Sequence, residues 1–125
     1  MLGREFWNTI HKFKESEFAC KCGCGLNNIS KDLVIQLDIA RLSSGVPFKL
    51  NSACRCVNHN RKEKGSISSS HLKGLAVDIA LDSSSDRFKI IKSLIVHGFN
   101  RIGVYEDFIH VDVDNAKAKN VIWYK

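Results

Sequence analysis

The chain has 125 residues, of which 44% are hydrophobic and 26% are charged, and its formal net charge is +6. These values are ordinary for a globular protein, and the length predicts one domain spanning residues 1–125 with a single core. The sequence excludes a membrane span, because no apolar run is long enough, and argues against a nucleic-acid partner, because the basic residues form no stripe with interleaved aromatics.

The lysines are spread along the chain rather than clustered. This spread is typical of a solvated surface, and it also suits attraction to an anionic polymer. The first residues, Met1 to Trp7, contain no sustained apolar core and no small-residue cleavage site. We therefore expect no secretory signal, a protein that is cytoplasmic as synthesised, and a monomer. Within residues 1–19, Phe6, Ile10 and Phe13 are close to helical spacing and predict a short helix.

Five cysteines fall in two clusters, within residues 20–24 and 54–56. They are compatible with a disulfide, a second metal site or reduced thiols. Thiols one residue apart rarely bridge each other without strain, so a disulfide would run between the clusters. A structural zinc would have as its ligands Cys22, Cys24, Cys54 and Cys56, although the Cys-x-Cys spacing differs from the Cys-x2-Cys of zinc ribbons. Either crosslink would tether the loop around Arg55 to the N-terminal region.

A helix is predicted over residues 31–42, with Ser30 as its N-cap and its end near Gly45. Its buried stripe consists of Leu33, Leu37 and Ala40. Residues 47–51 read as a strand, and the polar run 58–70 predicts a loop.

A second helix is predicted over residues 87–97, capped by Ser83 or Ser84, and it is expected to bury Phe88, Ile91, Leu94 and Ile95. Strands at 101–105 and 108–113 form a predicted hairpin. Together the elements predict an α+β fold, with a small, mostly antiparallel sheet and helices on the face opposite a metal site.

The predicted metal site depends on two alternating strands. In residues 76–81 the apolar side chains share one face, and Asp78 lies on the other between two alanines. His110 lies on the corresponding polar face of residues 108–113, so paired strands would project both side chains from one side. Two imidazoles and a carboxylate hold a catalytic Zn²⁺ with one position open, which predicts one zinc ion with the ligands His71, Asp78 and His110.

Asp107 lies at the bend of the predicted hairpin, three residues before His110. It can reach the metal only if the strand starts after it, and we expect it there as the general base. Asp112 shares the polar face with His110 and is either a positioning partner of that imidazole or a satisfied strand carboxylate. His59, in the basic loop, is a candidate substrate contact.

The pattern Ser69-x-His71-x-x-Gly74-x-Ala76-x-Asp78, followed by Asp107-x-x-His110, resembles the LAS metallopeptidases (lysostaphin, D-Ala-D-Ala peptidase and hedgehog types). It is most similar to the small D-Ala-D-Ala carboxypeptidase-like branch. The resemblance extends from about residue 13 onward, through the 51–60 segment, to the Trp123-Tyr124 ending. It implies the hedgehog/D-Ala-D-Ala peptidase-like fold and the zinc ligands named above. It also implies a catalytic carboxylate at Asp107, a substrate-binding Arg55 and a supporting polar role for Ser69.

The resemblance implies a zinc-dependent peptidase that hydrolyses peptidoglycan stem peptides, as a D,D-carboxypeptidase or as a crosslink endopeptidase. Its expected place of action is the bacterial cell wall or periplasm, as a phage or prophage lysis enzyme. One alternative is a non-catalytic zinc-binding module of the same fold that binds cell-wall or protein ligands, although such a module needs no base at Asp107. The other is a redox or structural protein built on the cysteines, for which zinc removal would leave function intact.

Overall fold

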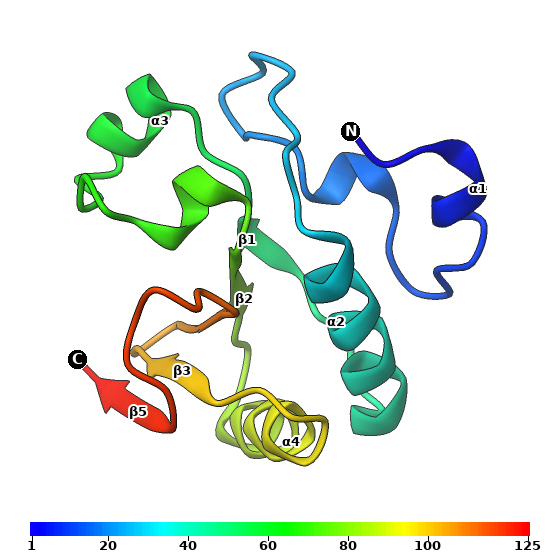
Figure 1. Ribbon diagram of the computed structural model, residues 1–125. Helices are drawn as coiled ribbons and strands as arrows, with labels where there is room; N and C mark the ends of the chain where they lie inside the picture. The colour runs from blue at the N-terminus through cyan, green and yellow to red at the C-terminus, as the bar shows by residue number, and fades with distance from the viewer.

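A computed structural model describes residues 1–125 and has an α+β fold built on a five-stranded sheet, in the order β1-β2-β4-β3-β5 (Figure 1). The strands are β1 (Leu50–Ser52), β2 (Ala76–Ala80), β3 (Arg101–Val104), β4 (Phe108–Asp112) and β5 (Val121–Tyr124). Neighbouring strands are antiparallel except β3 and β5, which run parallel. The predicted mostly antiparallel sheet is therefore confirmed.

Four α-helices and two short 3₁₀ helices surround the sheet. They are α1 (Arg4–Trp7), η1 (Glu15–Glu17), α2 (Lys31–Ser44), α3 (Val57–Lys62), η2 (Ser70–Lys73) and α4 (Ser84–Val96). Figure 1 shows the two long helices, α2 and α4, on one side of the sheet and α3 on the other. No helix combines the length and the apolar character that crossing a membrane requires.

The core lies between the sheet and the two long helices. β2 and β4 contribute Val77, Ile79, Ile109 and Val111, all fully buried. Because successive side chains of a strand alternate between faces, Asp78 and His110 project from the opposite face. The expected separation of an apolar face and a polar face on these two strands is observed, and it leaves the polar face free for chemistry.

Helix α2 follows its sequence pattern closely. The Ser30 side chain accepts a hydrogen bond from the backbone N–H of Leu33, and Gly45 ends the helix with φ of 74°. The predicted stripe of Leu33, Leu37 and Ala40 is fully buried. The N-terminal helix is shorter than expected: α1 ends at Trp7, and Phe13 is buried outside any helix.

Helix α4 has its predicted cap, since Ser83 accepts a hydrogen bond from the N–H of Asp86. Its buried face differs from the prediction, because Ile90 and Leu94 are buried whereas Phe88 is 67% exposed and Ile95 is 49% exposed. A helix with apolar residues on more than one side does not specify its rotation, and packing against α2 and the sheet decides it.

Two further predictions are wrong. The loop expected over residues 58–70 contains α3, whose N-cap is Cys56: its sulfur accepts the N–H of His59, and cysteine is not among the usual capping residues. The first strand begins at Leu50 rather than at Pro47. Strand β5, which pairs with β3 in parallel at the end of the chain, was not predicted from the sequence pattern.

Candidate metal centre

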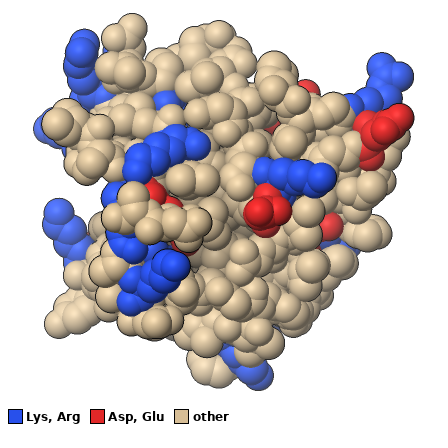
Figure 2. Space-filling view, in the orientation of Figure 1, with Lys and Arg blue, Asp and Glu red and all other residues tan.

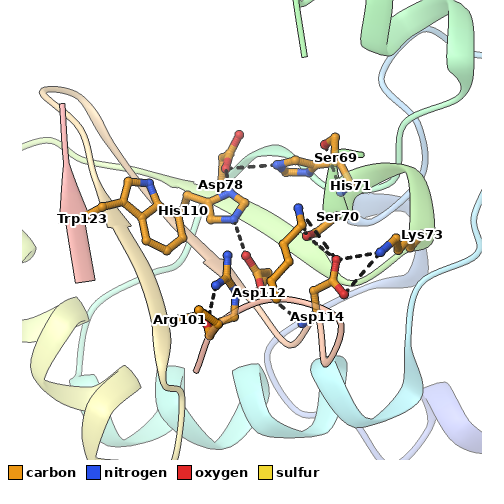
Figure 3. A network of polar contacts seen from close by, with 12 residues as sticks. Ser69, Ser70, His71, Lys73, Asp78, Arg101, His110, Asp112, Asp114 and Trp123 are labelled. Carbon is orange, nitrogen blue, oxygen red and sulfur yellow. Dashed lines mark hydrogen bonds and ion pairs between the residues drawn. The ribbon is translucent and has the colours of Figure 1, made fainter. Parts of the chain in front are cut away.

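Three side chains from different elements meet on the polar face of the sheet (Figure 3). Asp78 on β2 is directly paired with His110 on β4, and His71 comes from η2. His71 Nε2 lies 3.2 Å and His110 Nδ1 lies 3.0 Å from the same oxygen, Asp78 Oδ1. The three atoms all lie within 4.8 Å of one another, which is the separation expected of ligands that share one metal ion.

His71 is positioned by the short helix that contains it. The Ser69 side chain caps η2 by accepting a hydrogen bond from the N–H of His71, at 3.2 Å. The helix then ends at Gly74 with φ of 70°, a conformation that favours glycine. A Cβ atom at Gly74 would overlap the carbonyl oxygen of Asn28, so this position also requires the absence of a side chain.

Each imidazole has a hydrogen-bond acceptor at the ring nitrogen that faces away from Asp78. His71 Nδ1 lies 2.8 Å from the carbonyl oxygen of Ala53, and His110 Nε2 lies 2.8 Å from Asp112 Oδ2. A neutral imidazole that donates its single proton to that acceptor presents a lone pair on its other nitrogen. The two inward nitrogens and Asp78 Oδ1 would then be three acceptors with no proton between them. Such a set repels itself unless a cation lies among them, so the residues present fit a zinc ion.

Arg55 holds the second oxygen of Asp78. Its Nη2 lies 3.3 Å from Asp78 Oδ2, its Nε donates to Ser52 Oγ at 2.9 Å, and its Nη1 lies 3.3 Å from Asn60 Oδ1. A guanidinium has five N–H groups, so about two remain free after these three contacts. The side chain lines a cleft, and these free donors are available to a ligand there.

The charges of the centre alter the pKa values of its members. Burial raises the pKa of the Asp78 carboxyl, but hydrogen bonds from His110 and His71 outweigh burial and lower that pKa well below its usual range. Burial also raises the pKa of the Asp112 carboxyl, but hydrogen bonds from His110 and Arg101 outweigh burial and lower that pKa to about 2. Burial lowers the pKa of His110, but hydrogen bonds to Asp112 and Asp78 raise it above its ordinary value.

The centre lies in a cleft of about 400 Å³. One wall comes from the segment around α3 and carries Arg55 and residues 63–66. The other is aromatic, with the rings of Tyr105 and Phe108 stacked at 4.4 Å. Trp123 of β5 completes this wall and donates its indole N–H to the Tyr105 hydroxyl at 3.2 Å. The cleft therefore offers charged, hydroxyl and aromatic groups on either side of the metal centre, which suits an extended polar ligand.

The aromatic wall depends on a glycine in β3. A Cβ atom at Gly103 would lie 2.6 Å from the indole nitrogen of Trp123, so only a glycine allows that ring to lie against the strand. Trp123 also stacks under the guanidinium of Arg101 and lies 5.6 Å from the His110 ring.

Figure 2 shows the Lys and Arg side chains in separate groups over the visible face rather than in one stripe.

Asp107 is an expected site residue that the structure does not bring into the cluster. It lies in the turn before β4, where its carbonyl accepts the N–H of Leu81 at 3.0 Å. Its side chain is exposed and does not line the cleft, although Tyr105 and Phe108 on either side do. His59 is in α3 with its Nε2 3.7 Å from Glu63 Oε1, and it does not line the cleft either.

Two carboxylates behind the centre form a network that sequence reasoning found only in part. Asp112 accepts from Arg101 Nε at 2.7 Å as well as from His110. Asp114, which was not predicted as a site residue, accepts from Ser70 Oγ at 2.7 Å and pairs with Lys73 at 3.0 Å. The alternation of residues 110, 112 and 114 was the available signal, because it continues the polar face of β4 past the end of the strand.

The cysteines gather differently from the expected set. Cys54 is fully buried in the core, where its sulfur lies 3.6 Å from Asn27 Oδ1, so it is not a candidate ligand beside the others. The four sulfur atoms that do lie close together are those of Cys20, Cys22, Cys24 and Cys56.

A family model described as peptidase M15 matches residues 11–112. The matched region contains the three residues of the metal centre and Arg55, and it ends at Asp112 on β4. A comparison with curated proteins finds no match.

Proposed function

The chain belongs to the peptidase M15 family of zinc metallopeptidases, and from that premise we propose that it hydrolyses peptidoglycan stem peptides. The observation that carries the proposal is the convergence of His71 Nε2, Asp78 Oδ1 and His110 Nδ1 on the floor of an open cleft that Arg55 also lines. When bound there, zinc supplies a Lewis acid that polarises a peptide carbonyl and stabilises negative charge on its oxygen.

The proposed ligands are His71, Asp78 and His110, with Ala53 and Asp112 holding the two imidazoles by their outward nitrogens. These outward contacts fix each ring and its tautomer, which keeps the inward nitrogens available to the metal. Such partners support the assignment because each leaves the inward nitrogen of its ring without a proton of its own, as a metal ligand requires.

Arg55 is proposed to bind the terminal carboxylate of the substrate. Its guanidinium is permanently charged and forked, and three of its contacts are already made with Ser52, Asn60 and Asp78. These contacts hold the side chain in place before substrate arrives. A D-alanyl-D-alanine terminus carries a free carboxylate of the kind that the remaining N–H groups suit.

Asp107 is proposed to accept a proton from the attacking water and to pass it to the leaving amine. The assignment requires the turn before β4 to direct its carboxylate into the cleft, past the stacked rings of Tyr105 and Phe108. Among the other nearby carboxylates, Asp78 and Asp112 are held by histidines and arginines. Glu63 lines the opposite wall and is the competing candidate.

The test is zinc content combined with digestion of purified peptidoglycan. We expect His110→Ala to lose both zinc at this centre and cleavage. Asp107→Asn should keep the zinc and lose at least about 100-fold in rate, because a base contributes to the rate and not to the binding of the metal. Glu63→Gln is the matched control and should retain activity. The reverse result, with Glu63→Gln inactive and Asp107→Asn active, would identify Glu63 as the general base.

Mass spectrometry of the products separates the two possible bonds. Release of a terminal D-alanine identifies a D,D-carboxypeptidase, whereas loss of dimeric peptides identifies a crosslink endopeptidase. We propose the bacterial cell wall or periplasm as the place of action, as for a phage or prophage lysis enzyme. If the wild type binds zinc but cleaves neither substrate, the protein is a zinc-binding module that binds wall or protein ligands.

A further inference from the structure

A second group of potential metal ligands lies apart from the His71 centre. The sulfur atoms of Cys20, Cys22, Cys24 and Cys56 all lie within 4.8 Å of one another, although Cys56 is more than thirty residues from the others in sequence. None of these cysteines forms a disulfide. Four thiols at one point are a complete ligand set for a tetrahedral metal ion.

The separations between the sulfur atoms match such a site. Cys20 Sγ lies 3.4 Å from Cys22 Sγ, and Cys22 Sγ lies 3.7 Å from Cys56 Sγ. A tetrahedron with Zn–S bonds of about 2.3 Å places its sulfur atoms about 3.8 Å apart. The cluster is therefore arranged around a common centre, rather than in pairs that would each make one disulfide.

The backbone of the loop explains how three of these residues reach one point. In an extended chain, residues 20, 22 and 24 would point the same way but lie well apart. Gly23 and Gly25 have φ of 85° and 87°, which curls the loop, and the N–H of Gly23 donates to the carbonyl of Cys20 at 3.3 Å. The N–H of Cys20 donates to the carbonyl of Leu26 at 2.8 Å and closes the loop.

The fourth sulfur is presented by the opposite segment. Cys56 precedes α3, and its sulfur already accepts the N–H of His59 at 3.3 Å. Its own N–H donates to Cys20 Sγ at 3.4 Å, which joins the two segments at the cluster. N–H donors directed at sulfur favour thiolate over thiol and are the outer partners that metal-bound cysteines use.

The loop has little else to hold it in this shape. All five residues from Lys21 to Gly25 are exposed, so the loop buries almost no apolar surface of its own. Two solvent-accessible thiols in a loop without a core contact would be vulnerable to oxidation. Coordination to a metal accounts for both the shape of the loop and the position of the thiols.

We propose that Cys20, Cys22, Cys24 and Cys56 bind a structural Zn²⁺ ion, distinct from the zinc of the catalytic centre. All four positions are filled by sulfur, so this ion has no open position for a substrate. Binding exchanges up to four thiol protons for the metal, and no oxidant is needed. The ion fastens the N-terminal loop to the start of α3, directly beside Arg55, and so stabilises the wall of the cleft that faces the substrate.

The experiment measures zinc per chain and the atoms around it, with protein purified under reducing conditions. The wild type should contain about two zinc ions, and His71→Ala/His110→Ala about one. X-ray absorption of that double variant should show only sulfur around the metal, at about 2.3 Å. Cys22→Ser/Cys24→Ser should lose the all-sulfur ion, whereas the control Cys54→Ala, altered in the core beside the cluster, should keep both.

Four results would overturn the proposal. The His71→Ala/His110→Ala variant could contain no zinc, or zinc surrounded by nitrogen and oxygen only. The intact mass of wild type purified without reductant could be about 2 Da lower than that of the fully reduced chain, with peptide mapping that places the disulfide among these four cysteines. Iron in place of zinc would refute the metal assigned. Because the absorption measurement uses an unaltered cysteine cluster, it remains decisive even if the cysteine variants fail to fold.

Discussion

His110 makes a separate contact with each of its ring nitrogens. Nδ1 lies 3.0 Å from Asp78 Oδ1 and faces the proposed metal position, while Nε2 lies 2.8 Å from Asp112. Asp112 is itself held by Arg101 at 2.7 Å, so the ring orientation is set by a chain of contacts that starts well behind the metal. The strength of metal binding at this centre should therefore depend on a residue that never touches the ion.

This dependence gives the first prediction. Asp112→Asn should weaken zinc binding at the His71 centre by about 10-fold to 100-fold, because the amide is a poorer partner for the imidazole N–H. Zinc dissociation constants from competition with a chelator measure the effect, in a background with Cys22→Ser/Cys24→Ser. Asp82→Asn, which alters a carboxylate outside the cleft, should leave the constant unchanged. Equal affinities of the two variants would show that Asp112 does not support the ligand.

The second prediction concerns Arg55. Arg55→Lys keeps the charge but not the fork, so it should lose recognition of a terminal carboxylate. The measurement is KM for a stem peptide with a free C-terminus and for its C-terminal amide. We expect the preference of the wild type for the free acid to fall by about tenfold in the variant. Arg61→Lys, on the exposed side of α3, is the control. An unchanged preference for the free acid in Arg55→Lys would show that Arg55 does not recognise the terminal carboxylate.

At the scale of elements, the site depends on how η2 turns into β2. Gly74 has φ of 70°, and a Cβ atom there would overlap the carbonyl oxygen of Asn28. Gly45 has nearly the same φ, 74°, but a Cβ atom there would meet nothing within 4 Å. The two glycines therefore separate the cost of the backbone conformation from the cost of steric overlap.

The third prediction uses this pair. Gly45→Ala should lower the free energy of unfolding by about 1 kcal/mol, the cost of a left-handed backbone for alanine. Gly74→Ala carries the same cost plus the overlap with Asn28, and should lower it by about 3 kcal/mol. Urea denaturation of the metal-free proteins provides the comparison. If the free energy of unfolding falls no more in Gly74→Ala than in Gly45→Ala, the loop before α2 shifts to relieve the overlap without a measurable loss of stability.

The same elements show what sequence patterns determine. The alternation in residues 76–80 and 108–112 placed Asp78 and His110 on one face, because the period of a strand is a local property. Packing between elements is not local, and it decided both the rotation of α4, with Phe88 exposed, and the parallel pairing of β5 with β3. Of the four cysteines that the metal-site alternative named, Cys54 is buried in the core, and Cys20 lies in the cluster in its place.

Asp107 shows most clearly what the sequence pattern does not determine. Its spacing from His110 led to the expectation of a carboxylate at the centre, but whether a side chain in a turn points into a cleft depends on the turn itself. Its neighbours Tyr105 and Phe108 stack on one another and line the cleft, whereas Asp107 is exposed. Spacing along the chain therefore does not determine the direction of the carboxylate.

For the whole molecule, the charges of the metal centre should make stability depend on pH in opposite ways with and without zinc. The pKa of His110 is raised above 6.5 in the folded, metal-free protein, so its contribution is present below pH 6.5 and is lost as pH rises through the raised value. The pKa of Asp112 is lowered from 3.8 to about 2, so its contribution is present above 3.8 and is lost as pH falls toward 2. Zinc requires neutral imidazoles, so its contribution grows as pH rises.

The fourth prediction follows from these signs. In excess chelator, the free energy of unfolding should fall as pH rises above 6.5 and through the raised pKa of His110, and with excess zinc it should rise as pH rises from the same starting point. Urea denaturation at a series of pH values measures both curves. His110→Gln should flatten the fall seen in chelator, since the titrating group is removed. A fall of the same size in His110→Gln would assign it to another group.

The order of the strands has a consequence for motion. Asp78 and His110 lie on β2 and β4, which have neighbours on both sides in the order β1-β2-β4-β3-β5, while β1 and β5 form the two edges. Local opening of a sheet begins at its edges, where each strand has one neighbour to lose. The amides of the two ligand-bearing strands should therefore exchange their hydrogens for deuterium last. The spacing of Asp78 and His110 should therefore stay fixed even when the strands at the edges of the sheet open.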